Sequence, residues 1–506
     1  MSIFSFQSQN AAPPYHPPQP TDERRVSTLF LEELFRDCDD YQCRAVWPGG
    51  EAVPGLWLCW LDGLVDADAL SEEVLRPLTE ARRLACAAGD GARFRLLERG
   101  GIFACTVRAA ETMAAVSEAL LQGCCALVFD RLGSALCFEV KNSAVRPVGQ
   151  PTVEKTVKGA KDSFTETLRV NTALVRRRLR TPGLRLRETA VGRRSATGVA
   201  MLYVEDLADP ARVTELRRRL EDIDIDGLTA AGHLEQYLTD CPWSPFPQLL
   251  HTERPDKFAE ELLSGRIGLL ADGLPVGFLL PVALPAFLAV AEDRGQHFLT
   301  ASVLKLLRWL GLVLSLLFPA LFVAVAMYHQ EMIPTRLLQS MIAAKQDVPF
   351  SVAVEVLSML VAFELLMEAG VRLPDPVGDT VSIIGALIVG QSAVEAKVVS
   401  PIAVIVVAAT AICGFLMPSR DLGAALRLLR LLLVLLAVGL GLLGVALGVC
   451  LLLWHLGCMD SFGLPYLSPM AEGGFGAALR ALLRVPLPAD KLRPAGLRSP
   501  NRRNQK

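Results

Sequence analysis

The chain has 506 residues, of which 52% are hydrophobic, and its formal net charge is only −2. Its mean hydropathy of +0.37 is high for a water-soluble protein. Charged residues lie mainly before residue 300 and after residue 470, and the stretch between is depleted of them. This asymmetry favours a membrane-embedded half and argues against a nucleic-acid-binding protein.

The first 20 residues contain five prolines and lack the basic and apolar regions of a secretory signal. They predict a disordered, Pro-rich tail over residues 1–20, followed by a soluble half on the cytoplasmic side of a membrane. The 12 cysteines form no CxxC motif and no zinc-like Cys/His cluster. We therefore expect no metal site, no cofactor and no catalytic residue, and a protein that is not an enzyme.

An internal repeat organises the soluble half. The apolar strand and acidic turn at residues 56–66 recur at residues 199–209. Two shorter blocks recur at almost the same offset, with residues 120–123 matching 262–265 and residues 128–132 matching 270–274. This constant spacing predicts an α/β fold of two similar lobes, at residues 21–157 and 158–299.

A linking helix is predicted at the start of the second lobe, within residues 158–180. Apolar residues recur there at helical spacing, Asn171 lies on the same face, and arginines close the segment. No aromatic residues are interleaved with these arginines. We therefore favour a solvated face, a subunit contact or a membrane-headgroup contact over a nucleic-acid site.

Residues 300–456 are predicted to form an α-helical membrane domain with about four spans. Three uncharged runs are long enough to cross a bilayer: Trp309–Tyr328, Val398–Met417 and Leu431–Trp454. Thr380–Val394 is a shorter fourth span, and Phe350–Glu368, interrupted by glutamates, is expected to be interfacial or re-entrant. Gly444 and Gly448 form a GxxxG motif, which predicts close helix packing.

Residues 457–506 form a basic tail, with eight basic and three acidic residues. The positive-inside rule places this tail in the cytoplasm, and an even number of crossings follows.

Two sets of residues in the membrane domain are candidates for function. Ionisable residues in or beside membrane segments are costly, and both a functional and a structural role remain open for Glu364, Glu368, Glu395 and Lys397. The segment Thr380–Lys397 carries small residues on one side, which suits either close helix contact or a pore lining. The pore-lining candidates are Ser382, Gly385, Ala386, Val389, Ser392 and Ala393.

Five blocks carry a family resemblance: residues 163–179, 252–256, 328–334, 363–374 and 382–390. With these blocks in order, the chain resembles the A subunit of the GerA family of spore germination receptors. Two departures stand out, because the family usually has Gly-Pro-x-Glu-Gly-Phe at residues 159–164 and glycine at Lys397. Within the matching blocks, the interface or linker candidates are Asn171, Arg176, Arg177, Glu253 and Arg254.

The resemblance implies a subunit of a nutrient-sensing complex in the inner membrane of bacterial spores. The implied partners are a transporter-like B subunit, which binds the germinant, and a C-subunit lipoprotein. Such A subunits are expected to form a homo-oligomeric, ligand-gated ion channel. The alternatives are a SpoVAF-type germination protein and a non-conducting scaffold of a germination complex.

Overall fold

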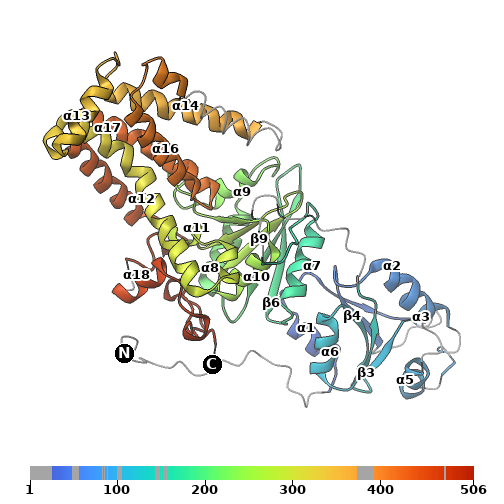
Figure 1. The fold of residues 1–506 in the computed structure, drawn as a ribbon. Coiled ribbons are helices and arrows are strands. Elements are labelled where there is room, and N and C mark those ends of the chain that lie inside the picture. Colours follow the sequence, from blue (N-terminus) through green and yellow to red (C-terminus); the bar gives the residue numbers. More distant parts are fainter. Residues whose placement is uncertain are drawn as a thin grey trace.

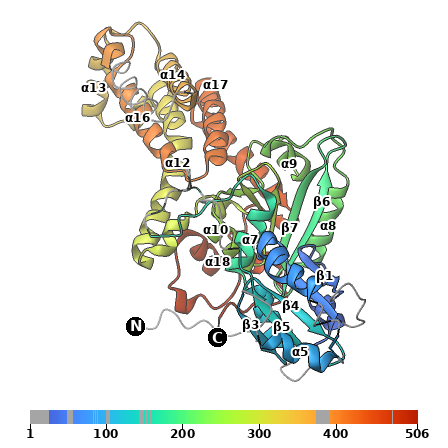
Figure 2. The same ribbon diagram turned by 90° about the vertical axis from the view of Figure 1, so that its right-hand side faces the viewer.

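Two α/β lobes and a bundle of long helices make up the computed structural model (Figure 1). The second lobe lies between the first lobe and the helices in both views (Figures 1 and 2). The structure describes residues 25–47, 56–81, 84, 86–87, 89–99, 105–142, 149, 151, 154, 156, 158–372, 391–471 and 474–505. The predicted disordered tail, residues 1–20, lies outside this part of the chain.

The first lobe is built on a five-stranded antiparallel sheet. Its strands, in spatial order, are β1 (Tyr41–Ala45), β2 (Leu56–Leu61), β4 (Cys124–Phe129), β5 (Ser134–Glu139) and β3 (Val107–Ala110). Its helices are α1 (Thr28–Leu34), α2 (Ala67–Ala69), α3 (Arg76–Glu80), α5 (Asp90–Glu98) and α6 (Met113–Leu121). Alternate residues of β4 enter two different apolar clusters, because both faces of the sheet are covered.

The second lobe repeats this arrangement. Its strand order is β6 (Leu184–Val191), β7 (Thr197–Val204), β9 (Ile267–Ala271), β10 (Gly277–Leu280) and β8 (Leu250–Thr252). Its helices are α7 (Leu168–Arg178), α8 (Pro210–Glu221), α9 (Ala231–Leu238), α10 (Pro255–Leu263) and α11 (Leu284–Phe287). Each sheet therefore places its strands in the same order, as the internal repeat predicts.

The helical half contains both long apolar helices and short surface helices. Its described helices are α12 (Phe298–Tyr328), α13 (Thr335–Lys345), α14 (Val352–Arg372), α16 (Pro401–Phe415), α17 (Arg420–Cys458) and α18 (Gly474–Leu482). By length and composition alone, α12 and α17 are long and apolar enough to cross a membrane. The predicted interfacial segment Phe350–Glu368 falls in α14, which packs against α12 and α16. Most of the predicted span Thr380–Val394 lies outside the described residues.

The helix α17 is a hairpin of two arms. Gly441 has φ 61° and ψ −139°, which breaks the helix. A Cβ placed on Gly444 would overlap the carbonyl of Leu436, and one on Gly448 would overlap the side chain of Leu433. Residues 15 apart in one straight helix lie about 22 Å apart, so these contacts require the chain to reverse. The GxxxG glycines thus pack closely against the first arm, as predicted.

This reversal corrects one prediction. We expected Leu431–Trp454 to cross the bilayer once, but the run turns back at Gly441. Asp421 at the start of α17 and His455 near its end both contact the second lobe. A straight 39-residue helix is about 58 Å long and could not place both ends there. The hydropathy of the run does not reveal the turn, because both arms are apolar.

The basic tail folds onto the second lobe. Its first residues form a small hairpin of β11 (Asp460–Ser461) and β12 (Leu464–Pro465). The guanidinium of Arg212, itself buried, donates hydrogen bonds to four tail carbonyls, those of Phe462, Gly463, Gly496 and Leu497. The tail and the second lobe therefore lie on the same side of any membrane that the helices cross.

Candidate functional site

The two lobes are joined by a buried ion pair. Arg176, on α7, is 1% exposed and forms a bidentate pair with Asp40 of the first lobe, at 2.7 and 2.8 Å. Its third nitrogen donates to the carbonyl of Leu184, at the start of β6. Arg177 donates to the carbonyl of Asn142. Both arginines therefore bind within the chain and hold the lobes together.

Asn171 closes the turn that precedes α7. Its side-chain oxygen accepts from the backbone N–H of Thr165 at 2.7 Å, and its amide donates to the carbonyl of the same residue at 2.6 Å. The side chain is fully buried. Such a pair satisfies both polar groups of the amide inside the fold, which gives Asn171 a positioning role.

Arg254 fastens the linker between the lobes to the second lobe. The guanidinium pairs with Asp256 and donates to Thr156 Oγ1 at 2.6 Å and to the carbonyl of Glu154 at 3.2 Å. Burial raises the pKa of Asp256, but its hydrogen bonds from Arg254 more than compensate and leave that pKa below normal. The carbonyl of Glu253 accepts from the N–H of Phe164.

The linker departs from the family pattern at residues 159–164, yet it is well packed. A Cβ on Gly159 would lie 2.7 Å from the Arg254 guanidinium, so the glycine is needed there. Asp162 pairs with Arg178 at 2.5 Å, and Phe164 packs edge-on against Phe258. The turn is thus formed with the residues that this chain has.

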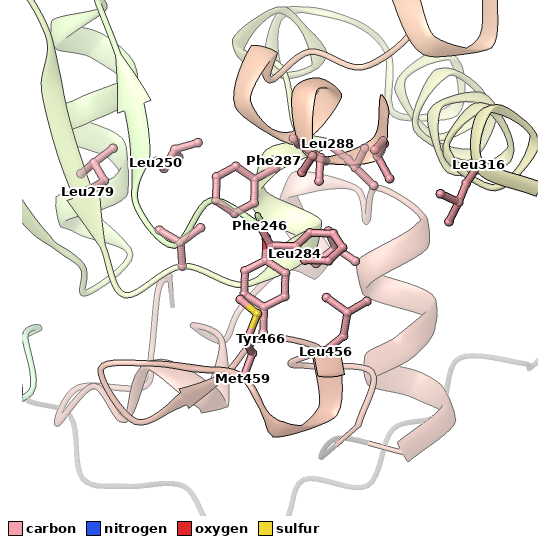
Figure 3. Close-up of a cluster of buried hydrophobic side chains, with 14 of the residues drawn as sticks. Phe246, Leu250, Leu279, Leu284, Phe287, Leu288, Leu316, Leu456, Met459 and Tyr466 are labelled. Carbon is pink, nitrogen blue, oxygen red and sulfur yellow. The ribbon is translucent and has the colours of Figure 1, made fainter. Parts of the chain in front are cut away.

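A buried aromatic cluster joins the second lobe to the helices. Tyr466 of the tail is fully buried and donates to the carbonyl of Pro247 at 2.9 Å, while its own carbonyl accepts from Leu284. Figure 3 shows side chains of the lobe, α12, α17 and the tail meeting at this place. The labelled members are Phe246, Leu250, Leu279, Leu284, Phe287, Leu288, Leu316, Leu456, Met459 and Tyr466.

A polar contact lies beside this cluster, at the edge strand β8. His251 Nδ1 is 3.5 Å from Asp421, the second residue of α17, and His251 Nε2 is 3.6 Å from Glu235 of α9. Burial raises the pKa of Glu235. A cleft of about 400 Å³ opens here between β8, the linker and the α16–α17 loop. We define this contact, the cleft and the aromatic cluster as the junction.

Ion pairs also connect the helices to one another. Glu364 of α14 pairs with Arg430 at 2.7 Å and with Arg427 at 3.1 Å, both on the first arm of α17. Glu368 lies one turn further along α14 and is exposed. Paired charges are what is expected of ionisable groups held at membrane depth. The sequence pointed to Glu364 but not to its partners, which lie more than 60 residues away.

Glu355 is a functional candidate that the sequence reading missed. Its carboxylate is completely buried, accepts from the N–H of Ser400 at 2.8 Å and lies 3.7 Å from Lys345 Nζ. It therefore fixes the start of α16 against α14. In the sequence this glutamate only interrupts an apolar run, so no local signal identifies its role.

The small-residue face is described only at its end. Ser382, Gly385, Ala386 and Val389 lie outside the described residues. Ser392, Glu395 and Lys397 are exposed, and Ala393 is half-buried. Glu395 accepts from Gln391, and Lys397 pairs with Asp347 at 2.5 Å.

Lys397 has φ +55°, a left-handed conformation that favours glycine. This backbone angle explains why relatives with the resembling motif carry glycine at the position. The described part of the chain brings these residues together beside α13, but it does not include the whole face.

The comparison with known proteins covers nearly the entire chain. The family model described as "Bacillus/Clostridium GerA spore germination protein" matches residues 30–496. The chain belongs to the GerA family. This match includes both lobes, the helices and most of the tail.

Individual relatives of this GerA family member are similar over most of their length. Spore germination protein KA of Bacillus subtilis is 36% identical over 87% of this chain and 80% of its own. Stage V sporulation protein AF of the same organism is 30% identical over 79% and 80%. A crystal structure of the N-terminal domain of the A subunit of the Bacillus megaterium spore germinant receptor GerK3 is 27% identical. It covers 51% of this chain and 95% of its own, with a TM-score of 0.40.

Proposed function

We propose that this GerA family protein is the membrane-embedded A subunit of a spore germinant receptor. The observation that carries this proposal is the family match across residues 30–496, which includes the lobes and the helices together. The higher identity with germination protein KA than with stage V protein AF favours a receptor subunit over a SpoVAF-type protein. We further propose that it resides in the spore inner membrane, with lobes and tail facing the core.

The junction supports a role in coupling. Both arms of α17 begin or end against the second lobe, through Asp421 and His455. A displacement of the lobe is therefore delivered to the base of the helices at two points. In this proposal a B subunit that has bound a germinant, and a C-subunit lipoprotein, act on the lobes or helices, and the junction passes the change on.

The proposed output is an ion channel formed by several copies. A few helices in one chain do not enclose an ion path, but a ring of copies can. Ser392 and Glu395 are exposed in the single chain, so they are available to face such an axis. With Lys397 nearby, these groups would form charged rings beside a narrow, small-residue wall.

Ion release from spores tests the channel proposal. Ala393→Phe should block nutrient-triggered ion release, because the ring fills the path that small residues leave open. Ala446→Phe is the matched control, since Ala446 is exposed on the second arm of α17. Both variants should be present at normal levels in spores before efflux is compared.

The same experiment separates the alternatives. If Ala393→Phe and Ala393→Ser both release ions as the wild type does, the pore assignment is wrong, and a non-conducting scaffold accounts better for the chain. If Ala393→Phe blocks release and Ala393→Ser releases ions without nutrient, the channel proposal is supported.

A further inference from the structure

An unusually exposed tryptophan stands beside the junction. Trp243 is 98% exposed, although burying an indole is strongly favourable. It lies at the tip of the loop between α9 and β8, and Tyr237 in α9 is half exposed. Large apolar groups held in solvent in this way mark a surface that contacts something else.

The loop holds Trp243 in place from both sides. Buried Gln248 accepts from the N–H groups of Asp240 and Cys241 and donates to the Cys241 carbonyl. After the tip, the Ser244 N–H donates to the same carbonyl. The exposure of the indole is thus the result of a braced turn and not of a loose loop.

The braced turn is attached to the end of α17. Ser244 Oγ lies 2.8 Å from His455 Nε2 and 3.1 Å from Met459 Sδ. Trp454, next to His455, is itself 70% exposed. Two exposed tryptophans therefore lie at the same end of one apolar helical arm.

The outer face of that arm leads directly to this place. Exposed leucines at positions 443, 447 and 451 precede Trp454 at spacings of four, four and three residues, which is one helical stripe. A stripe of this kind suits lipid chains. Tryptophan is enriched where such stripes reach the headgroups, because the indole has an apolar body and one N–H donor.

We propose that Trp243 is a membrane anchor of the soluble lobe, with its indole in the headgroup layer of the bilayer beside Trp454. This inference rests on the proposal that the helices are embedded in a membrane. The occupant of the surface is lipid, because the stripe that ends at Trp454 continues to the Trp243 loop. The anchor holds the second lobe close to the bilayer at the point where α17 leaves it.

Fluorescence quenching by brominated lipids tests this anchor. The full-length chain is reconstituted in liposomes whose acyl chains carry bromine either near the headgroups or near the chain ends. Trp243→Phe should remove part of the emission that headgroup-proximal bromine quenches, and should not change quenching by deep bromine. Trp47→Phe is the matched control, because Trp47 is also more than half exposed but lies in the first lobe.

The outcomes distinguish the anchor from the membrane proposal. If Trp309→Phe and Trp454→Phe reduce lipid quenching but Trp243→Phe does not, the helices are embedded and the anchor is wrong. If no tryptophan is quenched, the proposed membrane insertion itself fails. If Trp243 is quenched only in liposomes without the other receptor subunits, a protein partner occupies the surface in the complex and the anchor proposal is overturned.

Discussion

Single buried residues set the geometry between the parts of this protein. Arg176 and Asp40 form a completely buried pair between the lobes, and Glu355 fixes the start of α16 from α14. Removing one member of such a pair leaves an uncompensated charge, which costs more than a surface contact contributes. Positions of this type are identified by burial and partners, and neither is visible in a local sequence pattern.

The backbone at Lys397 leads to a prediction. A residue with a Cβ at φ +55° is strained relative to glycine by roughly 1 kcal/mol. We expect Lys397→Gly to be more stable than Lys397→Ala by about 1 kcal/mol, since both variants lose the exposed pair with Asp347 and only alanine keeps the strain. Thermal unfolding of the two variants in detergent measures the difference, and the opposite order would contradict the assigned conformation.

Glu235 should make stability depend on pH. Its pKa in the folded protein is raised by burial above the value of 4.5 expected when unfolded. Between these two values the folded state binds a proton that the unfolded state does not, so this contribution to stability is present at low pH and is lost as pH rises. The wild type should therefore lose stability relative to Glu235→Gln as pH increases above about 4.5.

Denaturant unfolding of both proteins across this pH range is the measurement for Glu235. The same substitution at the exposed Glu33 serves as the control and should show no comparable trend. A wild-type protein that gains stability relative to Glu235→Gln over this range would show that Glu235 is ionised and paired in the folded state.

At the scale of elements, sequence patterns predicted strands and apolar helices better than reversals. The repeated strand at Val199–Val204 was recognisable, because a buried strand keeps its apolar run and its distance from the next motif. The turn at Gly441 was not, since an apolar run of 24 residues has the same hydropathy whether it crosses once or folds back. The glycine spacing did carry the packing of the two arms.

The same limit explains what was missed in the candidate site. Glu364 stood out as a charge in an apolar segment, but its partners Arg427 and Arg430 only looked like residues flanking a span. Likewise, the junction joins His251 to Asp421, which are 170 residues apart. A single sequence records which residues are unusual and does not record which of them meet.

The hairpin in α17 can be tested by two matched substitutions. A Cβ on Gly444 would overlap the backbone of the other arm, whereas one on Gly439 meets no atom within 4 Å. We expect Gly444→Ala to reduce stability by about 1–3 kcal/mol through overpacking, and Gly439→Ala to be neutral or slightly stabilising. Equal effects in thermal unfolding would show that the arms do not pack as described.

At the scale of the whole molecule, the contact between the tail and the second lobe constrains topology. We expect both lobes and the tail to be on one side of the membrane and α13 on the other, because α12 leads from the lobe to α13. In sealed vesicles, an impermeant maleimide should label exposed Cys86 and an Ala489→Cys variant from the same side. An Ala343→Cys variant should react only from the opposite side.

Mass spectrometry of the labelled peptides reads out each position without removal of the other cysteines. Labelling of Cys86 and residue 489 from opposite sides would contradict the contact of the tail with the lobe. Labelling of residue 343 from the lobe side would instead show that α12 does not cross.

The grip of Arg212 on residues 462–463 and 496–497 also has a consequence for synthesis. The guanidinium is made early, but the carbonyls that satisfy it emerge only when translation is nearly finished. Until then the second lobe has a buried cation without its acceptors and an open apolar edge where Tyr466 belongs. The lobe therefore completes its folding after the ribosome has delivered the last helix, and a chain truncated before residue 460 should be left as a target for proteolysis.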